Sequence, residues 1–194
     1  MALDLDLSED NFRESGDDVA PGKCMVVLSE FKEHGASGTG NHIVDLEIVA
    51  HENPDEVGKV HTEFFSQTPK AGYRLRQLAV ASGLTTLERM KAAKDAGEYP
   101  TIEFNDAVGR PFYVLLATEE YTKRDGTIET SVKIGKGGAA MYRIDDKKYA
   151  DWPTNESMKA RGLKMLPKAG EPTEAPAQQT SAPAPASNEE LSPF

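Results

Sequence analysis

The chain has 194 residues, 38% of them hydrophobic, and a net charge of −10, which suits one domain of ordinary size with polar ends. No segment approaches the roughly 20 apolar residues of a membrane-spanning helix, and the acidic N-terminus lacks the features of a secretory signal. The only cysteine, Cys24, excludes an internal disulfide, so we expect a protein of the reducing cytoplasm.

The negative charge lies at the two ends of the chain. Residues 1–20 carry −6 and residues 169–194 carry −4, which accounts for the whole net charge and leaves 21–168 neutral. Within that neutral part, 70–94 has six bases and one acid, and 133–168 has nine bases and four acids. Because local patches govern binding to a polyanion, the net charge does not exclude a nucleic-acid partner.

The first half of the chain predicts an acidic lead-in over 1–19 followed by three strands. The run 22–33 is apolar and rich in β-branched residues, and 41–51 alternates apolar with polar positions. A flexible Gly-rich turn separates these two segments. A turn over 53–58 then leads to a third strand at 59–68.

The pattern changes to helical spacing after the third strand. Apolar residues recur three and four apart over 70–84, and 85–97 offers a Thr cap and a Gly stop, so both segments are predicted helices. Strand signals return in 110–135, which is predicted to be a hairpin whose Asp125-Gly126 tip suits a type I′ turn. One more short strand is expected within 139–145.

These elements predict a folded domain over 20–152. Residues 153–168 are expected to form a basic fringe or a short helix. The Ala-, Pro- and Ser-rich segment 169–194 has no apolar period and is predicted to be an extended, disordered tail.

Three strands, a helical insert and two or more strands are the order of an OB-fold. This fold is a mainly β, five-stranded Greek-key barrel with a helix between strands three and four, and it binds single strands or oligosaccharides. A small α+β open sheet fits the same order of elements.

The sequence shows no catalytic or metal-binding pattern. His34, His42, His51 and His61 are eight to ten residues apart, unlike the short spacings of zinc sites. The segment GKGG at 135–138 lacks the spacing of a P-loop. We therefore expect no enzyme activity, no metal and no cofactor.

Basic and aromatic residues are interleaved in a way that suits binding of a single-stranded nucleic acid. The basic side chains can meet its phosphates while its nucleobases stack on the aromatic side chains. On the predicted hairpin, the ring of Tyr113 is expected to face outward. The basic residues at the hairpin tip are expected to contact phosphates, and the alternative is that the tip is an ordinary solvated turn. Of the adjacent pair Phe64 and Phe65, one ring is expected to be exposed. The candidate nucleic-acid-binding residues are Phe65, Lys70, Arg74, Tyr113, Tyr121, Lys123, Arg124, Lys133, Lys136, Tyr142 and Arg143.

The C-terminal sequence SNEELSPF combines an aromatic end with two acids. Phe194 offers a ring and a carboxylate on one residue, behind Glu189, Glu190, Leu191 and Pro193. Such a tip suits a shallow pocket with a basic rim on a partner protein. We expect the tail to hold this tip clear of the domain.

This layout resembles the single-stranded-DNA-binding proteins of bacteria and their phages, which join an OB-fold to a low-complexity linker and an acidic tail ending in Pro-Phe. The matching tip residues are Glu189, Glu190, Pro193 and Phe194, and the segment EYTKRDGTIETSVKI with the helical insert is more similar to a phage family. The tip has two acids where that tail usually has several.

The resemblance implies a protein that coats and protects single-stranded DNA during phage DNA replication and recombination, in the cytoplasm of the host. It also implies recruitment of a polymerase, helicase or recombinase through the tip, and homo-oligomers are an option. Two alternatives remain at this point: an interaction module or inhibitor that acts through its acidic ends without binding DNA, and an RNA-binding OB-fold.

Overall fold

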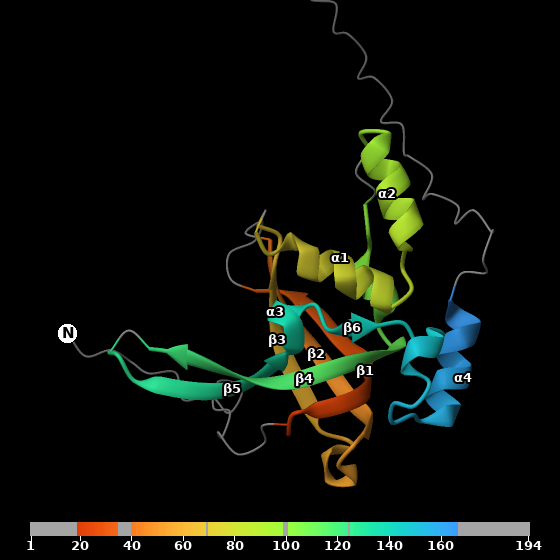
Figure 1. The fold of residues 1–194 in the computed structure, drawn as a ribbon. Helices are drawn as coiled ribbons and strands as arrows, with labels where there is room; N and C mark the ends of the chain where they lie inside the picture. The colour runs from red at the N-terminus through yellow and green to blue at the C-terminus, as the bar shows by residue number, and fades with distance from the viewer. Residues whose placement is uncertain (1–18, 35–39, 69, 99–100, 124, 167–194) are drawn as a thin grey trace, which may run out of the picture.

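The computed structural model describes residues 19–34, 40–68, 70–98, 101–123 and 125–166. Strands and helices follow the order expected from the sequence (Figure 1). The elements are β1 (Gly22–Glu33), β2 (Asn41–His51), β3 (Val60–Ser66), α1 (Gly72–Ala81), α2 (Leu87–Asp95), β4 (Pro111–Thr122), β5 (Ile128–Ile134), α3 (Gly135–Gly138), β6 (Met141–Tyr142) and α4 (Glu156–Met165). The acidic lead-in and the tail fall outside the described residues.

The strands form one antiparallel sheet in the order β3-β2-β1-β4-β5, with β6 paired to β4. β1 pairs with both β2 and β4, and two register shifts interrupt its ladder with β2. Such bulges bend a strand and increase its twist. The predicted antiparallel sheet with helices between β3 and β4 is confirmed.

The sheet is open where the barrel was expected to close. Within the described residues, β3 and β5 are the two ends of the strand order and do not pair with each other. The prediction of a ring closed by strand pairing is therefore wrong, and the open-sheet alternative describes the backbone. Side chains cross this gap instead, as described below.

The main hydrophobic core lies between the concave face of the sheet and α1. Val44, Leu46 and Ile48 alternate along β2 and are fully buried, because their side chains share one face of the strand. From α1, Leu75 and Leu78 pack into the same cluster. Burial of each such side chain stabilises the fold by about 1.5–3 kcal/mol, so α1 is a structural part of the domain.

A second, smaller core lies on the other face of the sheet, under α4. Asn155 caps this helix by accepting a hydrogen bond from Met158 N at 3.2 Å. The helix backbone comes close to β4, because a Cβ on Gly162 would lie 2.3 Å from Pro111 Cγ. The described chain therefore extends its packed structure to the end of α4.

Tyr113 belongs to this second core, and its expected exposure is wrong. It does face the opposite side from Phe112, but it is fully buried, together with Met25 and Ile144. Its hydroxyl lies 2.8 Å from Thr154 Oγ1. A ring with these neighbours is not available to stack on a nucleobase.

Helix α2 stands away from the sheet (Figure 1) and contains no buried residue. The predicted Thr cap is present, because the Thr86 side chain accepts a hydrogen bond from Arg89 N at 3.2 Å. Gly97 follows the helix with a φ of 73°, the left-handed conformation typical of a helix C-terminus.

The β4–β5 hairpin extends well beyond the body of the sheet (Figure 1). At its tip, Gly126 has a φ of 86°, and its N–H donates a hydrogen bond to Lys123 O at 3.0 Å. The expected type I′ turn also depends on the backbone at Arg124, which lies outside the described residues, so it stays a prediction. The side chain of Asp125 accepts a hydrogen bond from Thr127 N at 2.9 Å.

Candidate nucleic-acid interface

The open gap between β3 and β5 is bridged by the buried carboxylate of Glu63 on β3. Its Oε2 accepts a hydrogen bond from the backbone N–H of Ile134 on β5 at 3.1 Å. Arg74 from α1 pairs with Oε1 at 3.0 Å, and Lys133 from β5 approaches the same oxygen at 3.9 Å. One side chain therefore joins three elements where no strand ladder does.

The environment of Glu63 keeps it ionised. Burial opposes the charged form, but the contact with His61, the Ile134 N–H and the cations Lys133 and Arg74 outweigh it and lower the pKa to about 2. His61 Nε2 lies 3.5 Å from Oε2 and is itself buried. At neutral pH, Glu63 is therefore a fixed negative charge inside the gap.

These contacts change the roles expected for two predicted cations. Arg74 and Lys133 do lie together, as binding residues would, but both neutralise Glu63. Arg74 also lies over the Phe65 ring, with Cζ 4.8 Å from the ring centroid. Arg74 and Lys133 therefore help to hold the two sides of the gap together, and each has only part of its charge available to a ligand.

A cleft of about 510 Å³ opens along this gap. One side is the β4–β5 hairpin and the other is β3 with the start of α1. The charged and aromatic residues that line it are Glu63, Arg74, Glu119, Glu120, Tyr121 and Lys133. Ser131, Ile134, Gly137 and Gly138 complete the lining.

The turn α3 connects this cleft to a second group of residues. Lys136, Gly137 and Gly138 all have positive φ, and Lys136 is the only such residue other than glycine in the described chain, at φ 55° and ψ 43°. This conformation costs a residue with a Cβ roughly 1–2 kcal/mol. The turn is held by Tyr73, whose hydroxyl donates to Gly137 O at 2.6 Å.

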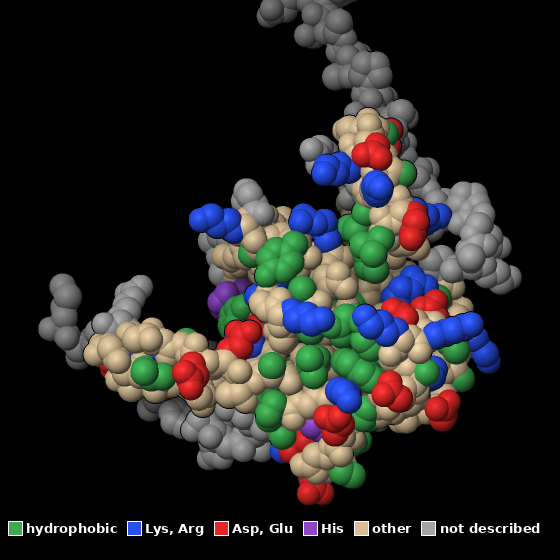
Figure 2. All heavy atoms as spheres, viewed as in Figure 1, with side chains coloured by type: hydrophobic (Ala, Val, Ile, Leu, Met, Phe, Trp, Pro, Cys, Tyr) green, Lys and Arg blue, Asp and Glu red, His purple; other side chains and the backbone are tan. Residues whose placement is uncertain are grey.

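Aromatic rings continue from Lys136 across the face shown in Figure 2. The ammonium of Lys136 lies 5.6 Å from the centroid of Tyr142, whose ring stacks on Tyr149 at 4.0 Å. Lys148 lies 5.8 Å from the Tyr149 ring, and Trp152 meets Tyr149 edge-on at 5.0 Å. Figure 2 shows green hydrophobic and blue basic side chains over the middle of this face.

We call Tyr73, Lys136, Tyr142, Lys148 and Tyr149 the cation–aromatic band. Burial and the neighbouring Tyr142 raise the pKa of Tyr149 to about 12, so its ring is neutral at physiological pH. Lys136 is exposed and pairs with no carboxylate among the described residues. The band therefore combines cations for phosphates with rings for bases.

The tip of the hairpin is less cationic than the sequence suggests. Lys123 forms an ion pair with Glu129, and Tyr121 OH donates to the other oxygen of that carboxylate at 2.7 Å. The Glu129 contacts raise the pKa of Lys123 and lower that of Glu129. Arg124 lies outside the described residues.

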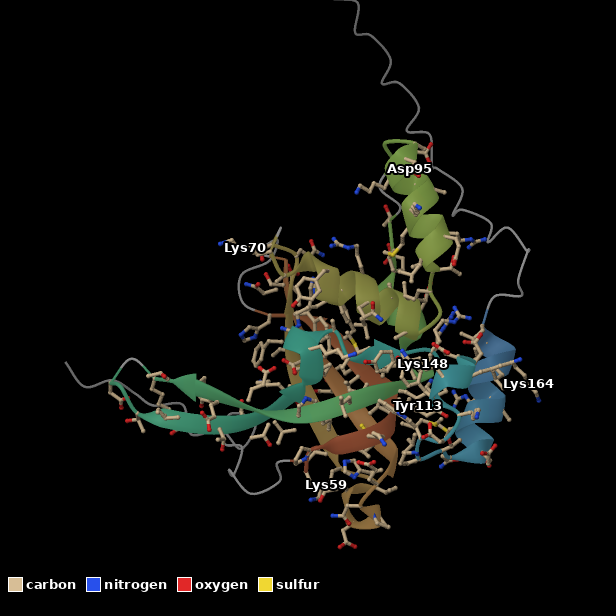
Figure 3. The ribbon with its side chains drawn as sticks, viewed as in Figure 1. Lys59, Lys70, Asp95, Tyr113, Lys148 and Lys164 are labelled. Carbon is tan, nitrogen blue, oxygen red and sulfur yellow. The ribbon has the colours of Figure 1, made fainter. Side chains whose placement is uncertain are left out.

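The two remaining predicted cations lie at the edges of this region. Arg143 follows Tyr142 but forms a two-point contact with Asp145, at 2.9 and 2.8 Å. Lys70 lies before α1 and is exposed (Figure 3). The structure therefore brings Arg74, Lys133, Lys136 and Tyr142 together, and leaves Lys70 and Arg143 outside the band.

The expectation that one ring of the pair Phe64 and Phe65 is exposed is confirmed, but the exposed ring is Phe64, and the candidate binding residue Phe65 is buried. Phe65 is 2% exposed and belongs to the main core, whereas Phe64 is 49% exposed. His34 contacts Phe64 edge-on, with ring centroids 5.2 Å apart. Phe64 adjoins Glu63 in the chain, but because successive side chains of a strand alternate, its ring lies on the opposite face of β3 from the Glu63 carboxylate.

A second hollow of about 800 Å³ lies between α1, α2 and the segment 101–104. Its lining includes the apolar residues Leu75, Met90, Ile102 and Phe104. It offers hydrophobic surface and does not include the rings of the cation–aromatic band.

Three further kinds of functional feature remain: metal sites, membrane-spanning helices and the predicted partner-binding tip. The described residues contain no group of three or more His, Cys, Asp or Glu placed to hold a metal ion. None of the helices in the described ranges is long and apolar enough to cross a membrane. The predicted partner-binding residues Glu189, Glu190, Leu191, Pro193 and Phe194 lie outside the described residues.

No protein-family model matches the chain, and no curated protein matches it either.

Proposed function

We propose that this protein binds single-stranded DNA along the cation–aromatic band and the adjoining cleft. The observation that carries the proposal is the continuity of the band. The α3 turn joins the cleft to Lys136, and Lys136 in turn lies over the first of two stacked tyrosines. Stacking on aromatic rings contributes about 1–3 kcal/mol per base without regard to sequence.

The strand order supports the finer proposal of an OB-fold. β1 lies between β2 and β4, the helices fall between β3 and β4, and the two unpaired ends of the sheet are β3 and β5. In this proposal, the barrel is partly open at one seam and Glu63 bridges it. The cleft and the β4–β5 hairpin adjoin that seam.

We extend the proposal to a phage accessory of DNA replication and recombination, which protects single strands and recruits a polymerase, helicase or recombinase through the tip at 187–194. The support for this part is the sequence of the tip, with its two acids and terminal aromatic.

The test measures the affinity of the full chain for labelled oligo-dT, an RNA of the same length and a matched duplex, at several salt concentrations. We expect oligo-dT to bind most tightly, with a logarithmic salt slope of about −0.7 per phosphate contacted. Equal affinity for oligo-dT and duplex overturns the proposal. Tighter RNA binding reassigns the site to RNA, and no binding to any of the three supports an interaction module instead.

A further inference from the structure

The cleft between β3 and β5 differs in charge from the band beside it. Three carboxylates, those of Glu63, Glu119 and Glu120, line it against two cations. Both cations, Arg74 and Lys133, already neutralise Glu63. Three carboxylates against two cations leave a net charge of −1 in the cleft, which disfavours a phosphate there, whereas the exposed ammonium of Lys136 lies on the turn at the edge of the cleft.

The carboxylates of Glu119 and Glu120 are free acceptors. Neither has a hydrogen-bond or ion-pair partner among the described residues, and both are exposed. The contrast is Glu129 on the same hairpin, whose two oxygens are taken by Tyr121 and Lys123. Two free carboxylates thus remain for a ligand that brings hydrogen-bond donors.

The strand register places the groups of the cleft on one face of the hairpin. Glu119 is directly opposite Ser131, and Ala117 is opposite Lys133. Residues two apart on a strand share a face, so Glu119, Tyr121, Ser131 and Lys133 lie on the same side. That face combines an acceptor, a hydroxyl, a cation and an aromatic ring.

We infer that this cleft receives one nucleobase of the bound strand and prefers a base with an exocyclic amino group. The amino group donates to the carboxylate of Glu119, which lies on the same face of the hairpin as Lys133, while the phosphates on either side follow the cations of the band. Carboxylates are the side-chain acceptors that read the amino group of cytosine. Thymine has no such group and presents carbonyl oxygens that the carboxylates repel.

This inference rests on the proposed function, because it names the chemistry that one part of the same site selects. The best probes are oligo-dC and oligo-dT of equal length at neutral pH, because the two bases are similar in size and differ at the amino position. We expect oligo-dC to bind about tenfold more tightly, since one hydrogen bond to a charged group is worth roughly that factor.

The decisive variant is Glu119→Gln combined with Glu120→Gln. An amide both donates and accepts, so it serves thymine as well as cytosine, and the preference should fall to about twofold or less. The matched control, Glu47→Gln with Glu98→Gln, removes two exposed charges outside the cleft. Both variants strengthen binding to every strand through net charge, so the ratio of the two affinities is the readout.

The outcomes separate the inference from the proposed function. A dC preference that the cleft variant loses and the control keeps supports the inference. Equal affinity of the native chain for oligo-dC and oligo-dT, or a preference that survives in the cleft variant, overturns it even though single-strand binding stands. Failure of both oligonucleotides to bind overturns the proposed function itself.

Discussion

The carboxylate of Glu63 on β3 accepts a hydrogen bond from the backbone N–H of Ile134 on β5 at 3.1 Å, across two strands that do not pair. A strand ladder would satisfy such an N–H through the backbone of its neighbour. Here a side chain does so, and its second oxygen also holds Arg74 of α1. The seam of the sheet therefore depends on one ionised group.

Glu63→Gln should lower the free energy of unfolding by about 1–3 kcal/mol, because it leaves the partly exposed cations Arg74 and Lys133 without their counter-charge. Urea unfolding of the native and variant chains measures this change. Glu47→Gln is the control, because Glu47 is exposed on β2 and its loss should change stability by less than about 0.5 kcal/mol. Equal midpoints for the native chain and Glu63→Gln would contradict the assigned role.

The same residue predicts an acid-dependent loss of stability. The folded-state pKa of Glu63 is about 2, below the ordinary value of 4.5. Its contribution is therefore complete above pH 4.5 and is lost as the pH falls toward about 2. We expect the unfolding free energy of the native chain to approach that of Glu63→Gln over this range. Parallel curves for the two proteins would show that Glu63 is not the group that titrates.

Phe64 and Phe65 should respond differently to truncation. Phe64→Ala should change stability and binding to oligo-dT little, because the ring is half exposed and lies on the face of β3 opposite to Glu63. Phe65→Ala should cost about 3–5 kcal/mol of stability as a core truncation. Thermal unfolding and oligonucleotide titration of both variants check this pair. A stability loss confined to Phe64→Ala would reverse the assignment.

Lys136 combines a strained backbone with an exposed charge, so two substitutions at this position separate the two properties. Lys136→Gly should be about 1 kcal/mol more stable than Lys136→Ala, because glycine adopts positive φ without strain. Both should weaken oligo-dT binding and reduce the logarithmic salt slope by about 0.7. Lys164→Ala is the charge control, since Lys164 lies on α4 at the far side from the hairpin (Figure 3). An equal loss of affinity in this control would show that the effect follows net charge alone.

Gly138→Ala should displace Arg74 and open the seam. A Cβ at this position would lie 1.9 Å from Arg74 Nε, and φ is 83°. Gly126→Ala is a matched control with a φ of 86° and no atom within 4 Å of its Cβ, so it carries the backbone strain without the clash. Urea midpoints should show a larger loss for Gly138→Ala. Equal losses would mean that strain alone accounts for the effect.

Deletion of 187–194 should strengthen binding to oligo-dT and abolish recruitment of partner proteins. The deletion removes two acids that compete with DNA for cations, together with the terminal aromatic. Fluorescence anisotropy measures the first effect, and capture of purified polymerase, helicase or recombinase measures the second. Glu189→Gln with Glu190→Gln separates charge from the Leu191 and Phe194 side chains. Unchanged affinity together with unchanged capture would contradict the role of the tip.

The order of strands and helices could be predicted because local signals agree with the fold. The alternation in 41–51 matches the buried positions of β2, and the Thr86 cap and Gly97 bound α2. The open seam could not be predicted, because it depends on which residues of β3 and β5 meet in space. Glu63 offers no sequence signal beyond a single acid in a strand.

The same limit explains the mistaken choice of Phe65 as a candidate binding residue. On β3, the inward positions are His61, Glu63 and Phe65, so polar residues occupy two of the three. Hydrophobic alternation therefore does not show which face of β3 points into the core. The choice between the adjacent rings Phe64 and Phe65 depends on the register of the strand, which the sequence does not show.

Tyr113 illustrates a different limit. The sequence correctly predicted that Tyr113 and Phe112 point to opposite faces of β4. Alternation along the strand does not show, however, whether another part of the chain covers the outer face. The cover comes from Trp152 and from Met158 of α4, about forty residues later in the chain. The basic residues of 153–168 suggest a solvated segment. Its few apolar side chains nevertheless pack onto the sheet, and only the tertiary structure shows this contact.

The open seam also leaves two strand edges without a neighbour. Proteins that contain β-sheets can associate by pairing their exposed edge strands, and charged side chains at such edges oppose the approach of a strand from another molecule. Arg74, Lys133 and Glu63 lie along both edges of this seam. Acid that protonates Glu63 loosens the seam but leaves Arg74 and Lys133 charged, so these two cations should still oppose pairing of β3 and β5 with another molecule under conditions in which the protein begins to unfold.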